Sequence, residues 1–196
     1  MGVAMARVAI TGHRPLLFHH LDPVFFDGPS KPGKAPGNNP DEWKRTALWT
    51  ADRQCYLLPD HVFATARDGG SKIRRGRGSL MGEIVSTLEV REDRILLDRW
   101  VPLDHEITRD PNQPVYVDVR MVKNPATRLR NMRYRLACSP GWHAAFTLLW
   151  EDTVVHPSQL EAALVEAGLR IGIGDGRGVG FGRFTVDAFT LEDPGA

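Results

Sequence analysis

Hydrophobic and polar residues alternate along much of the chain, and this alternation is typical of half-buried β-strands. It is clearest in five internal segments and at the end of the chain, namely 6–12, 54–58, 114–122, 127–138, 142–150 and 183–191. We predict two more strands over 83–90 and 94–103, joined by a short polar turn. The pattern therefore predicts a protein dominated by strands.

Three segments predict helices instead. The segment 40–51 has Asn39 or Asp41 as its capping residue, and the segment 59–68 begins with a proline. The segment 157–168 is the clearest, because apolar residues recur at helical spacing and a glycine ends it. Those apolar residues are Leu160, Ala163, Leu164 and Ala167. Strands and helices together predict an α+β fold.

Two segments lack regular periodicity. Five prolines and three glycines fall within 21–40, which predicts a long irregular loop. The segment 69–82 is basic and rich in glycine, and we predict that it is not packed. A loop as long as 21–40 inside a compact domain is usually functional or disordered.

The run 171–184, IGIGDGRGVGFGRF, has a glycine at every second position from Gly172 to Gly182. A dinucleotide fingerprint would follow a strand and open a helix, whereas this run follows a helix and enters a strand. A phosphate-binding P-loop would end in Gly-Lys-Ser/Thr, which is absent here. Two interpretations stay open: exposed amides that contact a phosphate or sugar backbone, or a loop that only packs against a neighbouring strand. The first makes Gly174, Gly176, Arg177, Gly178, Gly180 and Arg183 candidate binding residues.

Charge is balanced over the whole chain but basic in places. The 25 basic and 24 acidic residues leave a net charge of +1, so any footprint of a nucleic acid must be local. One basic cluster comprises Lys72, Arg74, Arg75 and Arg77, and a second comprises Arg128, Arg130, Arg133 and Arg135. No acid lies within the second cluster, so we predict a stripe that faces a ligand, which Lys44 and Arg45 extend. The alternative for the first cluster is a solvated charged loop.

The bulk composition predicts one globular domain over 1–196. Hydrophobic residues make up 42% of the chain, and no run of 18 apolar residues or signal peptide is apparent. Cys55 and Cys138 fit no metal-binding spacing and predict free thiols. We therefore expect a cytoplasmic protein with no membrane contact, no metal and no cofactor.

The glycine run, the helix before it and the strand after it resemble the signature of the RAMP superfamily of CRISPR-associated proteins. The opening residues RVAITG and PLLFHH, and the later segment YLLPDHVFATAR, are also similar to this family. Uncharacterised phage and prophage proteins resemble the chain too. The resemblance implies a ferredoxin-like (RRM-like) fold, with an antiparallel sheet, helices on one face and insertions at 21–40 and about 69–140.

The resemblance further implies a non-catalytic backbone subunit that binds guide RNA, or single-stranded DNA, in antiviral defence. Its partners would be other copies of itself or other effector subunits. A first alternative is a metal-independent endoribonuclease of the same superfamily, with His13, His19 or His20 as acid or base. Asp22 and Asp27 match the region where some members cut target RNA. A second alternative is a phage-encoded structural or assembly protein that binds no nucleic acid.

Overall fold

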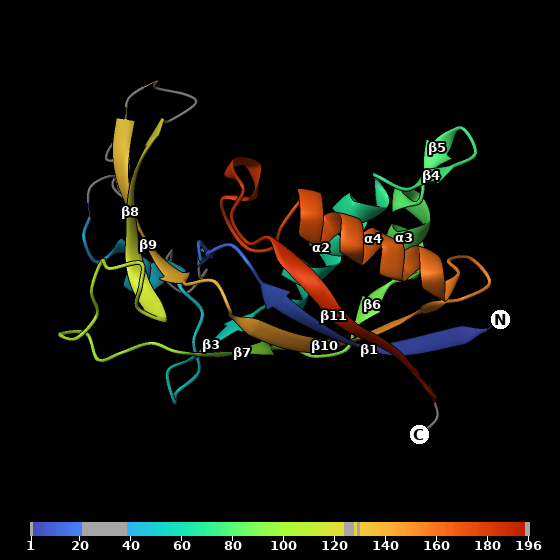
Figure 1. Cartoon of the computed structure of the whole chain (residues 1–196), viewed down its shortest axis with the longest axis horizontal. Coiled ribbons are helices and arrows are strands. Elements are labelled where there is room, and N and C mark those ends of the chain that lie inside the picture. Colours follow the sequence, from blue (N-terminus) through green and yellow to red (C-terminus); the bar gives the residue numbers. More distant parts are fainter. Residues whose placement is uncertain (1, 21–38, 124–127, 129, 195–196) are drawn as a thin grey trace, which may run out of the picture.

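A six-stranded antiparallel sheet forms the body of the molecule in the computed structural model, which describes residues 2–20, 39–123, 128 and 130–194. Its strands follow the order β11–β1–β10–β7–β3, and the short strand β6 pairs with β10 (Figure 1). The strands are β1 (Val3–Gly12), β3 (Gln54–Leu57), β6 (Glu89–Val90), β7 (Ile95–Trp100), β10 (His143–Glu151) and β11 (Phe184–Glu192). Strands β1 and β10 pair over their whole lengths, from Val3 opposite Glu151 to Thr11 opposite His143.

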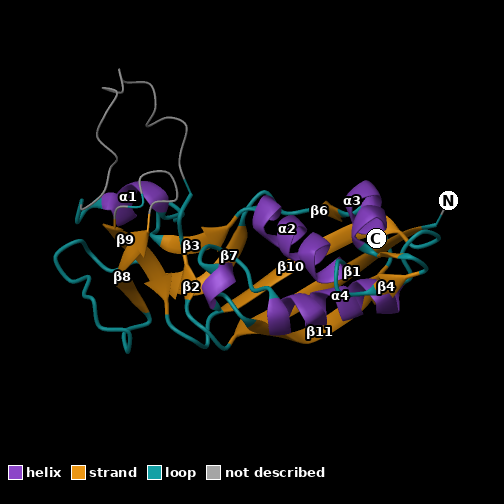
Figure 2. Ribbon diagram, turned by 90° about the horizontal axis from the view of Figure 1, so that it is seen from above, coloured by secondary structure: helices purple, strands orange, loops and turns teal. Residues whose placement is uncertain are grey.

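Two helices, α2 (Pro59–Gly70) and α4 (Pro157–Arg170), cover one face of this sheet (Figure 2). Along the chain β1, α2, β7, β10, α4 and β11 follow one another as a β-α-β-β-α-β unit. Their spatial order β11–β1–β10–β7 places the fourth strand beside the first and the first beside the third, as in ferredoxin-like folds. The predicted α+β fold is confirmed.

The alternation of strand β1 explains how the sheet meets its helices. Ala6, Val8 and Ile10 are buried and share one core with Leu160 and Leu164 of helix α4. Burial of these side chains contributes about 1.5–3 kcal/mol for each large aliphatic residue. The strand register is thereby set by which face is apolar.

A second, three-stranded sheet lies at one end of the molecule (Figure 1). It consists of β2 (Leu16–Leu17), β9 (Arg130–Cys138) and β8 (Val115–Lys123), in that order. The short helix α1 (Glu42–Thr46) packs on β9. The Glu42 carboxylate is buried there, and it accepts hydrogen bonds from the Arg133 guanidinium and, at 3.1 Å, from the Tyr134 amide.

Two predictions of secondary structure were wrong. The segment predicted as a strand over 83–90 is mostly helix α3 (Met81–Thr87), because Leu80, Ile84 and Leu88 are buried at i, i+4 spacing. The helix predicted over 40–51 is limited to α1. Beyond it Ala47 turns to an extended conformation, and Trp49 forms a β-bridge with Cys55.

The basic segment 69–82 is ordered rather than loose. It ends helix α2 and then forms a hairpin of β4 (Arg74–Arg75) and β5 (Gly78–Ser79), with Leu80 fully buried behind it. Most of the loop predicted over 21–40 lies outside the described residues. None of the described helices has the length and apolar character needed to cross a membrane.

Candidate nucleic-acid interface

The glycine-rich loop between α4 and β11 folds back on itself and joins the two sheets. The Ile173 amide donates to the Gly182 carbonyl at 2.9 Å, which closes the loop. The Thr65 hydroxyl of α2 donates to the Gly172 carbonyl at 3.2 Å, and the Asp175 amide donates to the Leu17 carbonyl of β2 at 2.9 Å. The loop is therefore held from both sides, and it lies between the helices and the three-stranded sheet (Figure 1).

Most glycines of the loop are required by its own folding. Five of them have positive φ values between +65° and +91°, namely Gly172, Gly174, Gly176, Gly180 and Gly182. At Gly182 a Cβ atom would also lie 1.8 Å from the Ile173 carbonyl oxygen. The predicted packing role of the loop thus accounts for these positions without any ligand.

Gly178 is different from these glycines. Its φ is not positive, it is exposed in a short 3-10 turn (Arg177–Val179), and a Cβ atom there would meet no protein atom within 4 Å. Neither backbone conformation nor packing within the described residues explains why this position lacks a side chain. A bare backbone at an exposed turn allows an external molecule to approach closely.

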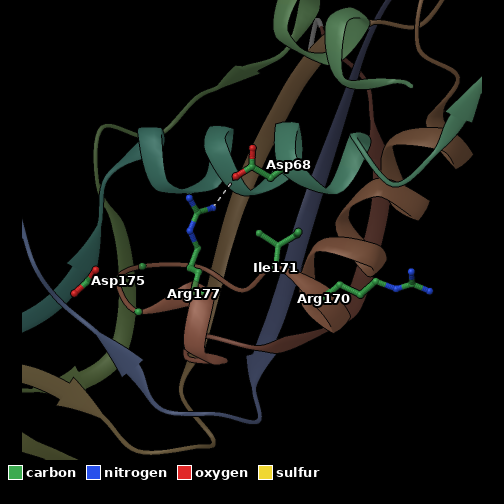
Figure 3. Close-up of a pocket in the computed structure, with 8 residues that line it drawn as sticks. Asp68, Arg170, Ile171, Asp175 and Arg177 are labelled. Atoms are coloured by element: carbon green, nitrogen blue, oxygen red, sulfur yellow. Dashed lines mark hydrogen bonds and ion pairs between the residues drawn. The ribbon is translucent and has the colours of Figure 1, made fainter. Parts of the chain in front are cut away.

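An open hollow of about 540 Å³ lies beside this turn (Figure 3). It is lined by Gly174 to Gly178 of the loop, by Arg170 and Ile171 at the end of α4, and by Asp68 of α2. Arg177 points across to Asp68, and its Nη1 atom lies 3.1 Å from Oδ2 of that carboxylate. Arg170 extends outward, with its Nε atom 2.9 Å from Glu166. The predicted cation Arg177 is therefore partly neutralised.

A smaller cavity of about 100 Å³ lies on the other side of the loop and brings three histidines together. His19 and His20 follow β2, His61 comes from the first turn of α2, and Asp175 comes from the loop. The Nδ1 atom of His61 accepts the Leu58 amide at 3.1 Å, whereas Nδ1 of His19 is buried with no partner among the described residues. Sequence reasoning selected His19 and His20 but missed His61.

Burial sets the charge state of two of these histidines. Desolvation lowers the pKa of His61 from its usual 6.5, and the neighbouring His20 lowers it further. Desolvation also lowers the pKa of His19, against the opposing charge of Asp175. Both imidazoles are therefore neutral near pH 7, a form in which a ring nitrogen accepts a proton or a hydrogen bond.

The arginine cluster of β9 divides into two pairs. Arg133 is bound to the buried Glu42, and the Nε atom of Arg135 lies 3.2 Å from Asp175. Both acids are distant from the arginines in sequence. The prediction that all four arginines face a ligand therefore did not account for these two ion pairs. Arg128 and Arg130 are exposed, and neither forms an ion pair with another described residue.

The basic cluster of the β4–β5 hairpin is also mixed. Arg75 is held by Glu83 at 3.5 Å and by the Val154 carbonyl at 2.6 Å. Lys72, Arg74 and Arg77 are exposed and form no ion pair within the described part of the chain. Further away, Lys44 lies 3.1 Å from both Asp41 and Asp104, and Arg45 is exposed on α1.

Arg183 ends the glycine loop in an unusual environment. Its Nη1 atom is buried and has no hydrogen-bond partner among the described residues, and desolvation lowers the pKa of its guanidinium. An unpartnered buried donor on a cation carries a free-energy cost that a bound anion would remove. Arg183 therefore stays a candidate through the exposed part of its side chain.

Other candidates do not join this site. Asp22 and Asp27 lie outside the described residues, and His13 is exposed. The His, Cys, Asp and Glu side chains that the structure describes form no group of three or more able to hold a metal ion. Cys55 and Cys138 are free, buried thiols.

The chain is similar to a solved chain of the Type III-B Cmr-beta. That chain was seen by cryo-EM in the Cmr-beta bound to cognate target RNA, and it shares 12% sequence identity with this protein at a TM-score of 0.54. The match covers 96% of this protein and 60% of the other chain, so this protein spans about three fifths of its length. The similarity shows a shared fold. No family model and no curated protein matches the sequence.

Proposed function

We propose that this protein is a CRISPR-associated, RAMP-type subunit that binds single-stranded RNA along the glycine loop and the β8–β9 hairpin. Its partners would be other subunits of an effector complex or other copies of itself. The exposed, unsubstituted backbone at Gly178 is the observation that carries the proposal, because it lets an external molecule approach this turn closely.

Three further features support RNA as that molecule. The partly exposed Arg183 side chain lies at the end of the same loop, and the β8–β9 hairpin carries exposed cations at Arg128 and Arg130. Phosphates are recognised by cations and by exposed amides of this kind. The chain with the similar fold comes from a structure bound to cognate target RNA.

The experiment is a titration of single-stranded RNA over a range of salt concentrations. Arg128→Ala/Arg130→Ala should weaken binding and reduce the slope of log affinity against log salt by about 1.4, since each phosphate contact on a single strand contributes about 0.7. Arg74→Ala/Arg77→Ala tests the β4–β5 hairpin in the same way. A double substitution that leaves both affinity and slope unchanged removes its cluster from the interface.

The alternative is that this protein has a structural or assembly role and binds no nucleic acid. In that case the unsubstituted chain would show no binding to RNA or to single-stranded DNA even at low salt. Such a flat titration would overturn the proposal and favour a structural or assembly role.

The histidine cavity favours a second candidate function, a metal-independent endoribonuclease. In such a reaction a neutral imidazole takes the proton of an RNA 2′-hydroxyl, whose oxygen attacks the adjacent phosphorus. A protonated group then gives a proton to the departing 5′-oxygen, which leaves a 2′,3′-cyclic phosphate. Burial keeps His19 neutral, which suits the first step, whereas Nδ1 of His61 is already occupied by the Leu58 amide. Asp175 lies at the same cavity.

This second function predicts cleavage of RNA in the presence of a metal chelator. The activity should be lost in His19→Ala, while RNA affinity stays close to that of the parent. Arg130→Ala is the matched control, because it should change affinity and not the cleavage rate of bound RNA. Intact RNA after prolonged incubation with the parent protein would eliminate the ribonuclease.

A further inference from the structure

Trp100 stands out among the five tryptophans of the chain because it is the most exposed. It is 54% exposed at the end of β7, whereas Trp43, Trp142 and Trp150 are at most 3% exposed, and Trp49 packs against Trp43 at 5.9 Å between ring centroids. Tryptophan is enriched among the residues that supply most of the binding energy at interfaces.

The ring of Trp100 lines a hollow of about 530 Å³ at the junction of the two sheets. Pro114, Ser139 and Pro140, at the base of the β8–β9 hairpin, also line it, together with Asn112 in the loop before the hairpin. Asp98 and Arg99 of β7 complete the lining. The hollow therefore combines an aromatic wall, proline rings and polar side chains.

The polar groups of this hollow are fixed in place and incompletely satisfied. The Asp98 carboxylate accepts the His143 amide at 2.7 Å and pairs with Arg99 Nη1 at 2.8 Å. Arg99 is only 14% exposed at its side chain, and its Nε atom is buried with no partner among the described residues. The hollow therefore places an arginine side chain beside the exposed indole, an arrangement that suits a planar ligand with acceptor atoms on its edge.

A few hydrogen bonds connect the segment next to the hollow with the end of the glycine loop. The Gly141 amide donates to the Gly12 carbonyl at 2.7 Å, and the Trp142 indole donates to the Arg14 carbonyl at 2.9 Å. The Arg14 amide in turn donates to the Arg183 carbonyl at 3.3 Å, at the end of the glycine loop. Arg14, which belongs to this set of hydrogen bonds, is exposed and forms no ion pair among the described residues.

We propose that the Trp100 hollow binds one unstacked base of a single-stranded nucleic acid, with the base stacked on the indole beside the Arg99 side chain. The inference rests on the proposed RNA-binding function and adds a base pocket at the far end of the interface. Stacking tolerates every base, because each has a π face, so we expect weak sequence preference.

The test measures quenching of tryptophan fluorescence by acrylamide, with and without single-stranded RNA. In the parent protein RNA should shield the accessible emission. Trp100→Phe should remove most of this change, because Trp43, Trp142 and Trp150 are buried and Trp49 is partly buried. Trp100→Ala should lower RNA affinity by about 5- to 150-fold, as expected for loss of one stacked base. The salt slope should stay unchanged, because no phosphate contact is removed. Trp100→Phe should keep most of the affinity.

Leu103→Ala provides the matched control, since Leu103 is 51% exposed nearby but does not line the hollow. It should leave RNA affinity and shielding unchanged. If RNA binds the parent but Trp100 remains open to acrylamide, the base pocket is wrong while the proposed function stands. If RNA does not bind at all, the proposed function fails first. Shielding that appears only when a second protein is added would assign the hollow to a protein partner and overturn the inference.

Discussion

Two glycines in the same loop distinguish a structural residue from a binding residue. Gly182 is confined by its own fold, with positive φ and the Ile173 carbonyl at 1.8 Å from an added Cβ. At Gly178 an added Cβ would meet no atom of the described chain within 4 Å, and φ is not positive. The same residue type in one motif therefore has two separable roles.

Alanine substitutions measure this difference. Gly182→Ala should destabilise the protein by about 2–4 kcal/mol, through steric overlap and a strained backbone. Gly178→Ala should change stability by less than about 0.5 kcal/mol, yet weaken RNA binding severalfold because the added methyl group blocks close approach. Urea denaturation and RNA titration test both effects. Unchanged RNA affinity in a folded Gly178→Ala protein would contradict the role assigned to this position.

Burial of His61 predicts a pH dependence of stability. The lowered pKa means that the unfolded chain binds more protons than the folded one at pH values just below 6.5. The free energy of unfolding should therefore be highest above pH 6.5 and fall as the pH is lowered toward the folded-state pKa of His61. In His61→Gln the loss between these values should be smaller, as measured by urea denaturation at a series of pH values. An identical pH profile in the variant would show that His61 is not responsible.

At the scale of elements, the attachment of α1 depends on one buried acid. Glu42 accepts hydrogen bonds from the Arg133 guanidinium and the Tyr134 amide, and both donors belong to β9. A helix of only five residues has no stability of its own, so tertiary contacts must hold it. The arginine that the sequence placed in a ligand-facing stripe is used here to join two elements.

Glu42→Gln should lower the free energy of unfolding by about 2–3 kcal/mol, because it leaves the half-buried Arg133 without an opposing charge. The double substitution Glu42→Gln/Arg133→Gln should recover part of that loss, since it removes both charges. Chemical denaturation of the two single variants and the double variant gives the coupling energy. Strictly additive losses would show that the pair does not act as a unit.

At the scale of the whole molecule, the net charge does not describe how charge is distributed over the surface. The net charge is +1, yet exposed cations gather at the β8–β9 hairpin and the β4–β5 hairpin. Some acids form ion pairs with arginines inside the fold, such as Glu42 with Arg133 and Asp175 with Arg135. Local fields, and not the total charge, therefore decide whether the molecule attracts a polyanion.

The intact protein should carry bound nucleic acid when purified at low salt. Its ultraviolet spectrum should show a nucleic-acid contribution that disappears after ribonuclease treatment and a high-salt wash, with a matching decrease in particle size. Arg128→Ala/Arg130→Ala should carry less bound material. A parent protein that elutes as a nucleic-acid-free monomer at low salt would contradict the proposed assembly on RNA.

The elements that sequence predicted well are those with strong local signals. Helix α4 and strands β1, β8, β10 and β11 each carry an unbroken period of apolar residues. The segment 83–90 carried β-branched residues that favour a strand, but the burial of Ile84 decided for a helix. Tertiary packing overrode local propensity there.

Local periodicity encodes the α+β class and the order of elements around the glycine run, and that order excludes a nucleotide-binding loop. Which cations are free depends instead on how distant segments pack. Asp175 and Glu42 reach Arg135 and Arg133 across long stretches of chain, and His61 and Trp100 join their cavities in the same way. Such contacts between distant segments follow from how the two sheets pack together, and no local pattern encodes them.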